Sequence, residues 1–146
     1  MASVKSVNIT NLDASPSVMI DSNNSSSPIM VWHDTYEASS LASGSDITIG
    51  RIPAGATIHD VILKCDALGG SSTLKVGDSG DDDRYLAAVG TWNAAGQVQS
   101  MLGGSTAANT AVAGLGYKVN SATDLKITTG GASITGTIYF WVHYSI

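Results

Sequence analysis

The chain has 146 residues, a net charge of −5 and only 13% charged residues, which predicts a single domain with a mostly uncharged polar surface. Its seven Lys and Arg residues are scattered, which argues against the clustered cations that bind nucleic acid or an anionic membrane. Cys65 is the only cysteine, so no intrachain disulfide can form, and no apolar run approaches the roughly 20 residues of a membrane span. We therefore expect no nucleic-acid partner and no membrane partner.

Residues 1–28 are polar, with isolated apolar residues and a Ser/Asn-rich tract at 22–28. We interpret them as an extended N-terminal arm whose apolar residues bind a partner: Val4, Val7, Ile9 and Leu12. The alternative is an ordinary first strand followed by a loop, because termini are loosely held unless they dock. The segment lacks the continuous apolar stretch of a signal peptide, so we expect synthesis and folding in a reducing cytosol.

Short β-type segments alternate with turns of Gly, Pro, Ser and Asp over residues 29–146, and this pattern predicts an all-β domain. The expected strands are 29–36, 47–52, 57–67, 73–76, 85–89, 125–129 and 134–145. In 57–67 we expect one face to hold Val61, Leu63, Cys65 and Ala67, and we expect 73–76 to pair with this strand as a hairpin. Residues 93–116 are rich in Ala and Gly and fit a loop, a short helix or closely packed strands.

The clearest strand is 134–145, where apolar residues occupy alternate positions. Ile138, Phe140 and Val142 are expected to enter the core. The opposite face carries Tyr139 and Trp141, and we expect this face to meet a neighbouring subunit. For the aromatic residues in general, the sequence leaves three roles open, namely core packing, protein interfaces and stacking against carbohydrate.

An acidic turn around Gly80 contains Asp78, Asp81, Asp82 and Asp83. Carboxylates in such a cluster are weak candidates for ligands of a hard cation such as calcium, although the EF-hand spacing is absent. We favour the simpler interpretation of a solvated turn whose Asp side chains accept hydrogen bonds from nearby backbone N–H groups.

Motifs of catalysis are missing from the sequence, which has no G-x-S-x-G elbow, no P-loop and no dinucleotide fingerprint. The histidine spacing fits no zinc motif. Outside the acidic turn, the nearby carboxylate pairs that could support hydrolysis are Asp34 with Glu37 and Asp60 with Asp66. We predict that the protein is not an enzyme and needs no cofactor.

The segment from Tyr36 to Tyr85 contains the phrases YEASSLASGSD and ITIGRIPAGATIHDVILKCDALGGSSTLKVGDSGDDDRY. This third of the chain resembles the decoration proteins of tailed bacteriophages, which are also called cement or head-stabilisation proteins and are jelly-roll virion components. The resemblance carries no functional residue with it, because that family has no short catalytic signature.

The resemblance implies a two-sheet antiparallel β-sandwich of jelly-roll type over 29–146, preceded by the N-terminal arm. It also implies a homotrimer on the capsid surface of the virion, made in the host cytoplasm, that binds the major capsid protein and stabilises the expanded shell. The alternative is a receptor- or carbohydrate-binding module of a phage tail fibre or spike.

Overall fold

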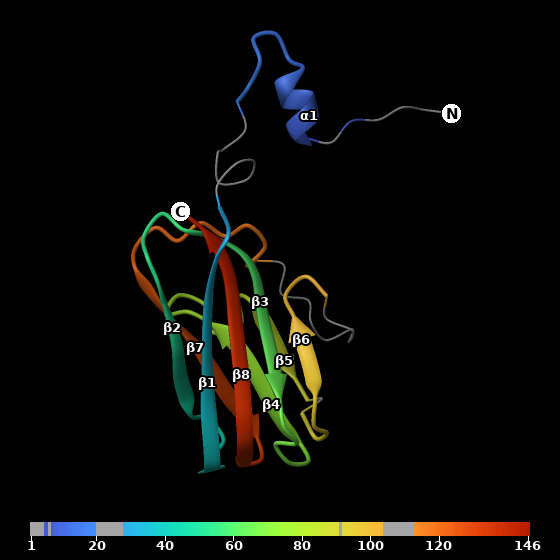
Figure 1. The fold of residues 1–146 in the computed structure, drawn as a ribbon, viewed down its shortest axis with the longest axis vertical. Helices are drawn as coiled ribbons and strands as arrows, with labels where there is room; N and C mark the ends of the chain where they lie inside the picture. Colours follow the sequence, from blue (N-terminus) through green and yellow to red (C-terminus); the bar gives the residue numbers. More distant parts are fainter. Residues whose placement is uncertain (1–4, 6, 20–27, 91, 104–112) are drawn as a thin grey trace, which may run out of the picture.

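The computed structural model describes residues 5, 7–19, 28–90, 92–103 and 113–146. These residues form one short helix, α1 (Val7–Leu12), and eight strands in two sheets (Figure 1). The strands are β1 (Met30–Leu41), β2 (Asp46–Ile52), β3 (Thr57–Cys65), β4 (Ser72–Gly77), β5 (Leu86–Val89), β6 (Gln97–Ser100), β7 (Thr123–Gly131) and β8 (Ile134–Ser145). The all-β prediction is therefore confirmed.

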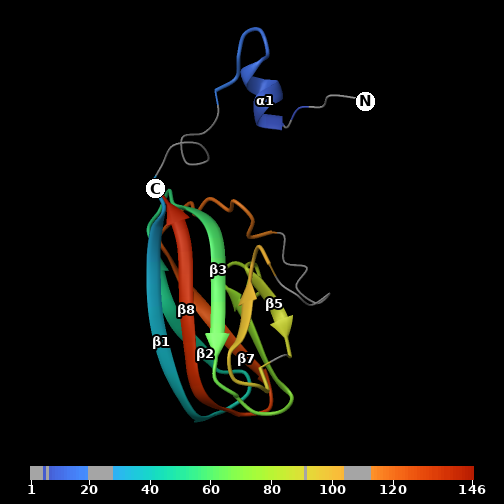
Figure 2. The ribbon, with the colours of Figure 1, turned by 45° about the vertical axis from the view of Figure 1, so that its right-hand side comes forward.

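The two sheets have the strand orders β1-β8-β3-β6, called here the first sheet, and β2-β7-β4-β5, the second sheet. Every pairing is antiparallel. The chain passes repeatedly from one sheet to the other, so strands that are neighbours in a sheet are mostly distant in sequence (Figures 1 and 2). This is the two-layer arrangement of a jelly roll, as the resemblance implied.

The core lies between the sheets and is built from alternate residues of each strand. In β8, Ile138, Phe140 and Val142 are buried as predicted, and in β3 Val61 and Leu63 are fully buried. Burying one such side chain contributes about 1.5–3 kcal/mol relative to leaving it exposed. These contacts make the sandwich a rigid support for the residues on its outer faces.

The predicted hairpin between 57–67 and 73–76 is wrong. β3 pairs with β8 and β6 in the first sheet, whereas β4 pairs with β7 and β5 in the second sheet. The turn between them carries the chain across the core. Ala67 is also exposed, because β3 ends at Cys65 and Leu68 returns to the core instead.

The described part of the N-terminal segment contains α1, a helix that was not predicted from the sequence. The Asp13 N–H donates to the Ile9 carbonyl oxygen at 3.0 Å, and the Val18 N–H donates to the Asn11 carbonyl oxygen at 2.8 Å. Residues 7–19 thus form a helix and an irregular segment, not the first strand offered as an alternative. Figure 1 shows α1 apart from the two sheets.

Of the three alternatives for 93–116, a strand is correct at Gln97–Ser100, where β6 pairs with β3. Residues 104–112 of this segment lie outside the described residues. Among the residues that the structure describes, no helix has the length and apolar character needed to cross a membrane.

Candidate interaction face

The outer surface of the first sheet carries several aromatic and apolar side chains. Strand pairing aligns Trp141 of β8 with His33 of β1 on one side and Ile62 of β3 on the other. One row further along, Tyr139 lies between Thr35 and Lys64. We call this surface the aromatic face, and it comprises Val31, His33, Thr35, Ile62, Lys64, Val98, Tyr139, Trp141 and His143.

The rings on the aromatic face are held nearly parallel. The His33 and Trp141 ring centroids are 4.8 Å apart with an interplanar angle of 23°, and those of Tyr139 and Trp141 are 6.4 Å apart at 18°. Val31 and Val98 flank them and are 56% and 50% exposed. Tyr139 and Trp141 therefore lie on the outer side of the first sheet as expected, with neighbours from all four strands, and contact of this face with another subunit stays a prediction.

A shallow hollow of about 620 Å³ opens beside these rings. Lys64 and Asp66 contribute charged groups to its wall, next to Tyr139 and Trp141. Cys65 also borders it, but burial, together with the charge of Asp66, raises the pKa of the thiol to about 12. The thiolate that a nucleophile needs is thus scarce near neutral pH, so Cys65 is a poor nucleophile.

The outer surface of the second sheet has a different character, because ion pairs cover it. Arg51 donates to Asp124 at 2.7 Å and 3.1 Å, and the Lys126 Nζ lies 3.6 Å from Asp46. Docking a partner on such a surface would remove water from charged groups, which is costly. The aromatic face carries one charged side chain, that of Lys64, although Asp60 and Glu37 lie in adjoining rows of the same outer surface.

The acidic turn after β4 divides into two parts. Asp78 is only 8% exposed, and its carboxylate accepts hydrogen bonds from the Gly80 N–H at 2.9 Å and the Asp81 N–H at 3.1 Å. It also accepts from Arg84 Nε at 2.9 Å and from the Tyr85 hydroxyl at 3.0 Å. Asp78 therefore shapes the turn through backbone hydrogen bonds, as the simpler interpretation expects, but it is buried and not solvated.

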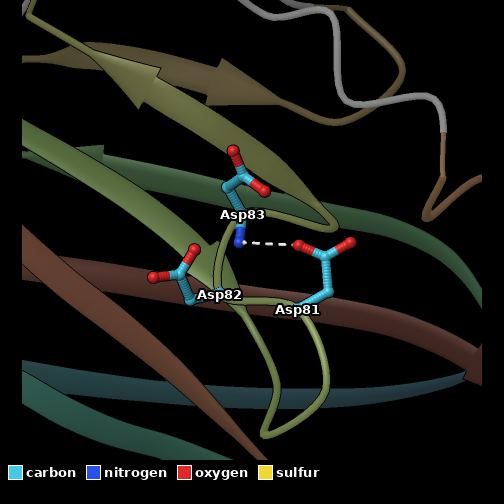
Figure 3. A group of neighbouring side chains, drawn as sticks. All are labelled: Asp81, Asp82 and Asp83. Atoms are coloured by element: carbon cyan, nitrogen blue, oxygen red, sulfur yellow. Dashed lines mark hydrogen bonds between the residues drawn. The ribbon is translucent and has the colours of Figure 1, made fainter.

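Asp81, Asp82 and Asp83 form the other part of the turn (Figure 3). One carboxylate oxygen of each lies within 4.8 Å of the others. A hydrogen bond with Asp81, partial burial and the neighbouring carboxylates raise the pKa of Asp83. The structure thus brings together three of the four predicted cation ligands and engages Asp78 elsewhere, and cation binding stays a prediction.

The carboxylate pairs considered for hydrolysis do not converge. Asp60 accepts from the Ser100 hydroxyl at 2.9 Å, and Asp66 accepts from the Thr137 N–H at 3.3 Å. Six residues of extended chain separate these two acids, which corresponds to about 20 Å. Asp34 and Glu37 differ in strand parity and project from opposite faces of β1.

The predicted arm residues are only partly described. Val4 lies outside the described residues, as do the side chains of Val7 and Leu12. Ile9 lies in α1 and is 46% exposed. Its partner-binding role, and that of the arm as a whole, remains a prediction.

No protein-family model matches the chain, and no curated protein matches it. Solved structures do share its fold. A chain of "Cyanophage Pam1 capsid asymmetric unit" aligns with a TM-score of 0.65 and 20% identity, over 92% of this chain and 96% of that chain. A chain of "Capsid of Ralstonia phage GP4" aligns with a TM-score of 0.59 and 19% identity, over 81% and 84%.

A third match is a chain of "Acidic stable capsid structure of Helicobacter pylori bacteriophage KHP30". Its TM-score is 0.58 and its identity 10%, over 81% of this chain and 87% of that chain. At these identities the likeness concerns the fold, and it extends over most of both chains in each case. This sandwich is therefore a fold that chains in bacteriophage capsid structures also adopt.

Proposed function

We propose that this chain is a virion structural protein that decorates the outside of a phage capsid. In this proposal it binds the major capsid protein as a homotrimer, stabilises the expanded shell and catalyses no reaction. The observation that carries the proposal is the aromatic face, which is displayed on a fold shared with chains of phage capsid structures.

The mechanism we propose is mechanical. A trimer that touches several capsid subunits at once gains avidity, so each individual contact can be weak. Because the protein binds assembled capsid subunits and not their dissociated forms, binding shifts the equilibrium towards the intact shell. Burying the rings and aliphatic side chains of the aromatic face would contribute to binding, and Trp and Tyr are frequent anchors of such interfaces.

The direct test adds purified protein to heads that lack it and measures the temperature at which they rupture. We expect bound protein to raise the rupture temperature, and sedimentation to give the mass of a trimer for the free protein. Protein that does not sediment with heads at any concentration tested would contradict the proposal.

Trp141→Lys should weaken head binding by about ten-fold or more, because it replaces a central aromatic side chain of the aromatic face with a charge. The matched control is Thr128→Lys, which adds the same charge on β7, on the outer side of the second sheet. Binding curves with sedimented heads measure both. Equal binding by the two variants would place the capsid contact away from the aromatic face.

Deleting residues 1–20 should reduce head binding without lowering the stability of the sandwich, because the residues that the structure describes among them, 5 and 7–19, belong to neither sheet. We propose that this arm orders on the capsid or adds to a neighbouring copy. Thermal unfolding of the free protein supplies the control. Head binding by the deletion variant equal to that of the full chain would show that the arm does not contribute to the capsid contact.

A second candidate is a carbohydrate-binding module of a tail fibre or spike. It is favoured by the hollow that combines Lys64 and Asp66 with the rings of Tyr139 and Trp141. Carbohydrate binding should then appear on a glycan array and disappear in Trp141→Lys. Mass analysis of separated heads and tails distinguishes the two candidates by location.

A further inference from the structure

The free edge of β1 differs from the other sheet edges of the described residues. β1 is at one end of the first sheet and pairs only with β8 (Figure 2). It has 12 residues, whereas the edge strands β5 and β6 have 4 each. The fourth edge strand, β2, has 7 residues and a register shift between Thr48 and Gly50. Short strands and bulges are the usual means by which proteins protect an exposed edge.

β1 has a weaker protection, a charged side chain: the Asp34 carboxylate accepts from the Thr35 N–H at 2.8 Å, and pairing with another strand would exchange this bond for an intermolecular one. Residues 30–38 contain no Pro and no Lys, and the pairing with β8 is regular until the shift between Ala38 and Leu41. The strand starts beside exposed apolar groups, since Ile29 and Val31 are 64% and 56% exposed. An exposed, regular and partly apolar edge of this kind is a template for pairing with another strand.

We propose that the β1 edge pairs with β1 of a second copy, in antiparallel orientation about a two-fold axis at Thr35. The pairing would join the first sheets of the two copies into one continuous sheet. It places His33 of each copy opposite Glu37 of the other on the same face, at the separation where cross-strand pairs interact. An imidazole N–H can then donate to a carboxylate at two symmetric positions.

Side-chain pairing favours this register over the neighbouring ones. Centring the axis one residue earlier would set Asp34 against Asp34 of the other copy, and centring it at Glu37 would oppose two glutamates. Centring it at His33 would oppose two imidazoles. Like charges directly opposite destabilise a sheet, which disfavours the centres at Asp34 and Glu37. A centre at Tyr36 opposes no like charges, but it sets Glu37 against Thr35 and forms no His–Glu pair. The self-complementary pairing of His33 with Glu37 therefore favours Thr35 as the centre.

Both members of the proposed pair are already positioned in the single copy. His33 stacks on Trp141, and Glu37 accepts a hydrogen bond from the Thr137 hydroxyl at 2.6 Å. Because these contacts restrict the side chains before association, less conformational entropy is lost when the strands pair. The carboxylate still has lone pairs for the imidazole of the other copy.

This contact goes beyond the proposed function. A two-fold contact cannot close a trimer, so on a shell it would link neighbouring trimers to one another. It is a property of the free chain and is tested without heads. Its failure would therefore leave capsid decoration untouched, and failure of capsid decoration would leave this contact untouched.

The test is disulfide cross-linking of purified protein under mild oxidation. In Thr35→Cys the two new thiols would lie directly opposite, with Cα atoms about 4.5–5.5 Å apart, which a disulfide can bridge. In the control Ser39→Cys, on the same strand, the two thiols would be offset by eight residues, or about 27 Å. Cys65 stays in place because its buried thiol is unreactive.

We expect Thr35→Cys to form covalent dimers about ten-fold faster than Ser39→Cys. His33→Glu in the Thr35→Cys background should abolish the faster cross-linking, because it sets two glutamates opposite each other. Adding Glu37→His should restore the faster cross-linking, because each pair again joins a histidine to a glutamate. Thermal unfolding verifies that every variant folds. Equal cross-linking at positions 35 and 39, or no rescue by the double exchange, would overturn the proposal.

Discussion

Asp78→Asn should lower the free energy of unfolding by about 3 kcal/mol, although it changes the volume of the side chain very little. The Asp78 and Arg84 side chains are only 6% and 15% exposed, and Arg84 Nε donates to Asp78 at 2.9 Å. The amide would leave the Arg84 charge uncompensated in a buried site. Its N–H₂ group would also face the Tyr85 hydroxyl, which donates to the Asp78 carboxylate in the native protein.

The loss of stability in Asp78→Asn should affect contacts beyond the acidic turn. Arg84 also lies over the Tyr117 ring, 4.1 Å from its centroid, so Asp78 helps to hold the segment before β7 against the acidic turn. The matched control is Asp124→Asn, which breaks the exposed pair with Arg51. Solvent screens that pair, and its loss should leave the urea midpoint unchanged within error. Equal effects of the two variants would contradict this account of Asp78.

The difference in unfolding free energy between the native protein and Asp78→Asn should depend on pH. Burial alone would raise the pKa of Asp78, but hydrogen bonds from Gly80, Arg84 and Tyr85 and the charge of Arg84 outweigh it, so the pKa is lowered. A lowered pKa contributes stability above the ordinary value of about 4, and this stability is lost as the pH falls through the folded-state value. The difference in stability between the native protein and Asp78→Asn should therefore narrow below about pH 4, measured by urea unfolding across pH.

The strand at 134–145 could be predicted almost to the residue, because a strand that buries one face carries the two-residue period in its own sequence. The same parity placed Tyr139 and Trp141 on the outer face. Their neighbours His33 and Lys64 could not be predicted, since they come from β1 and β3 through pairings at long range. Local patterns therefore identified the aromatic residues but not the face that they build.

Local sequence patterns did not predict where the chain passes from one sheet to the other. A Gly/Ser turn reverses the chain whether the next strand pairs beside the last one or crosses the core, so 69–72 did not reveal the step from β3 to β4. The sequence of the acidic turn also did not show which of its carboxylates is buried. Its four carboxylates look equivalent in sequence, but only Asp78 lies close enough to the end of β4 to be buried against Arg84 and Tyr85.

Gly77→Ala is the second change that should strongly destabilise the sandwich, again by about 3 kcal/mol. Gly77 ends β4, and the acidic turn folds back directly over it. An added Cβ would overlap the carbonyl oxygen of Asp81 and the backbone of Asp82. These atoms cannot easily move aside, because the Asp78 N–H donates to that same carbonyl oxygen at 2.9 Å.

The matched control for this prediction is Gly70→Ala, in the exposed turn between β3 and β4, where an added Cβ would meet nothing within 4 Å. Urea unfolding should show the loss for Gly77 and almost none for Gly70, since the Ala at 70 creates no overlap and slightly restricts the unfolded chain. Unchanged stability of Gly77→Ala would mean that the turn can lift from β4 at little cost. The close approach of the turn to β4 would then not be what holds Asp78 against Arg84.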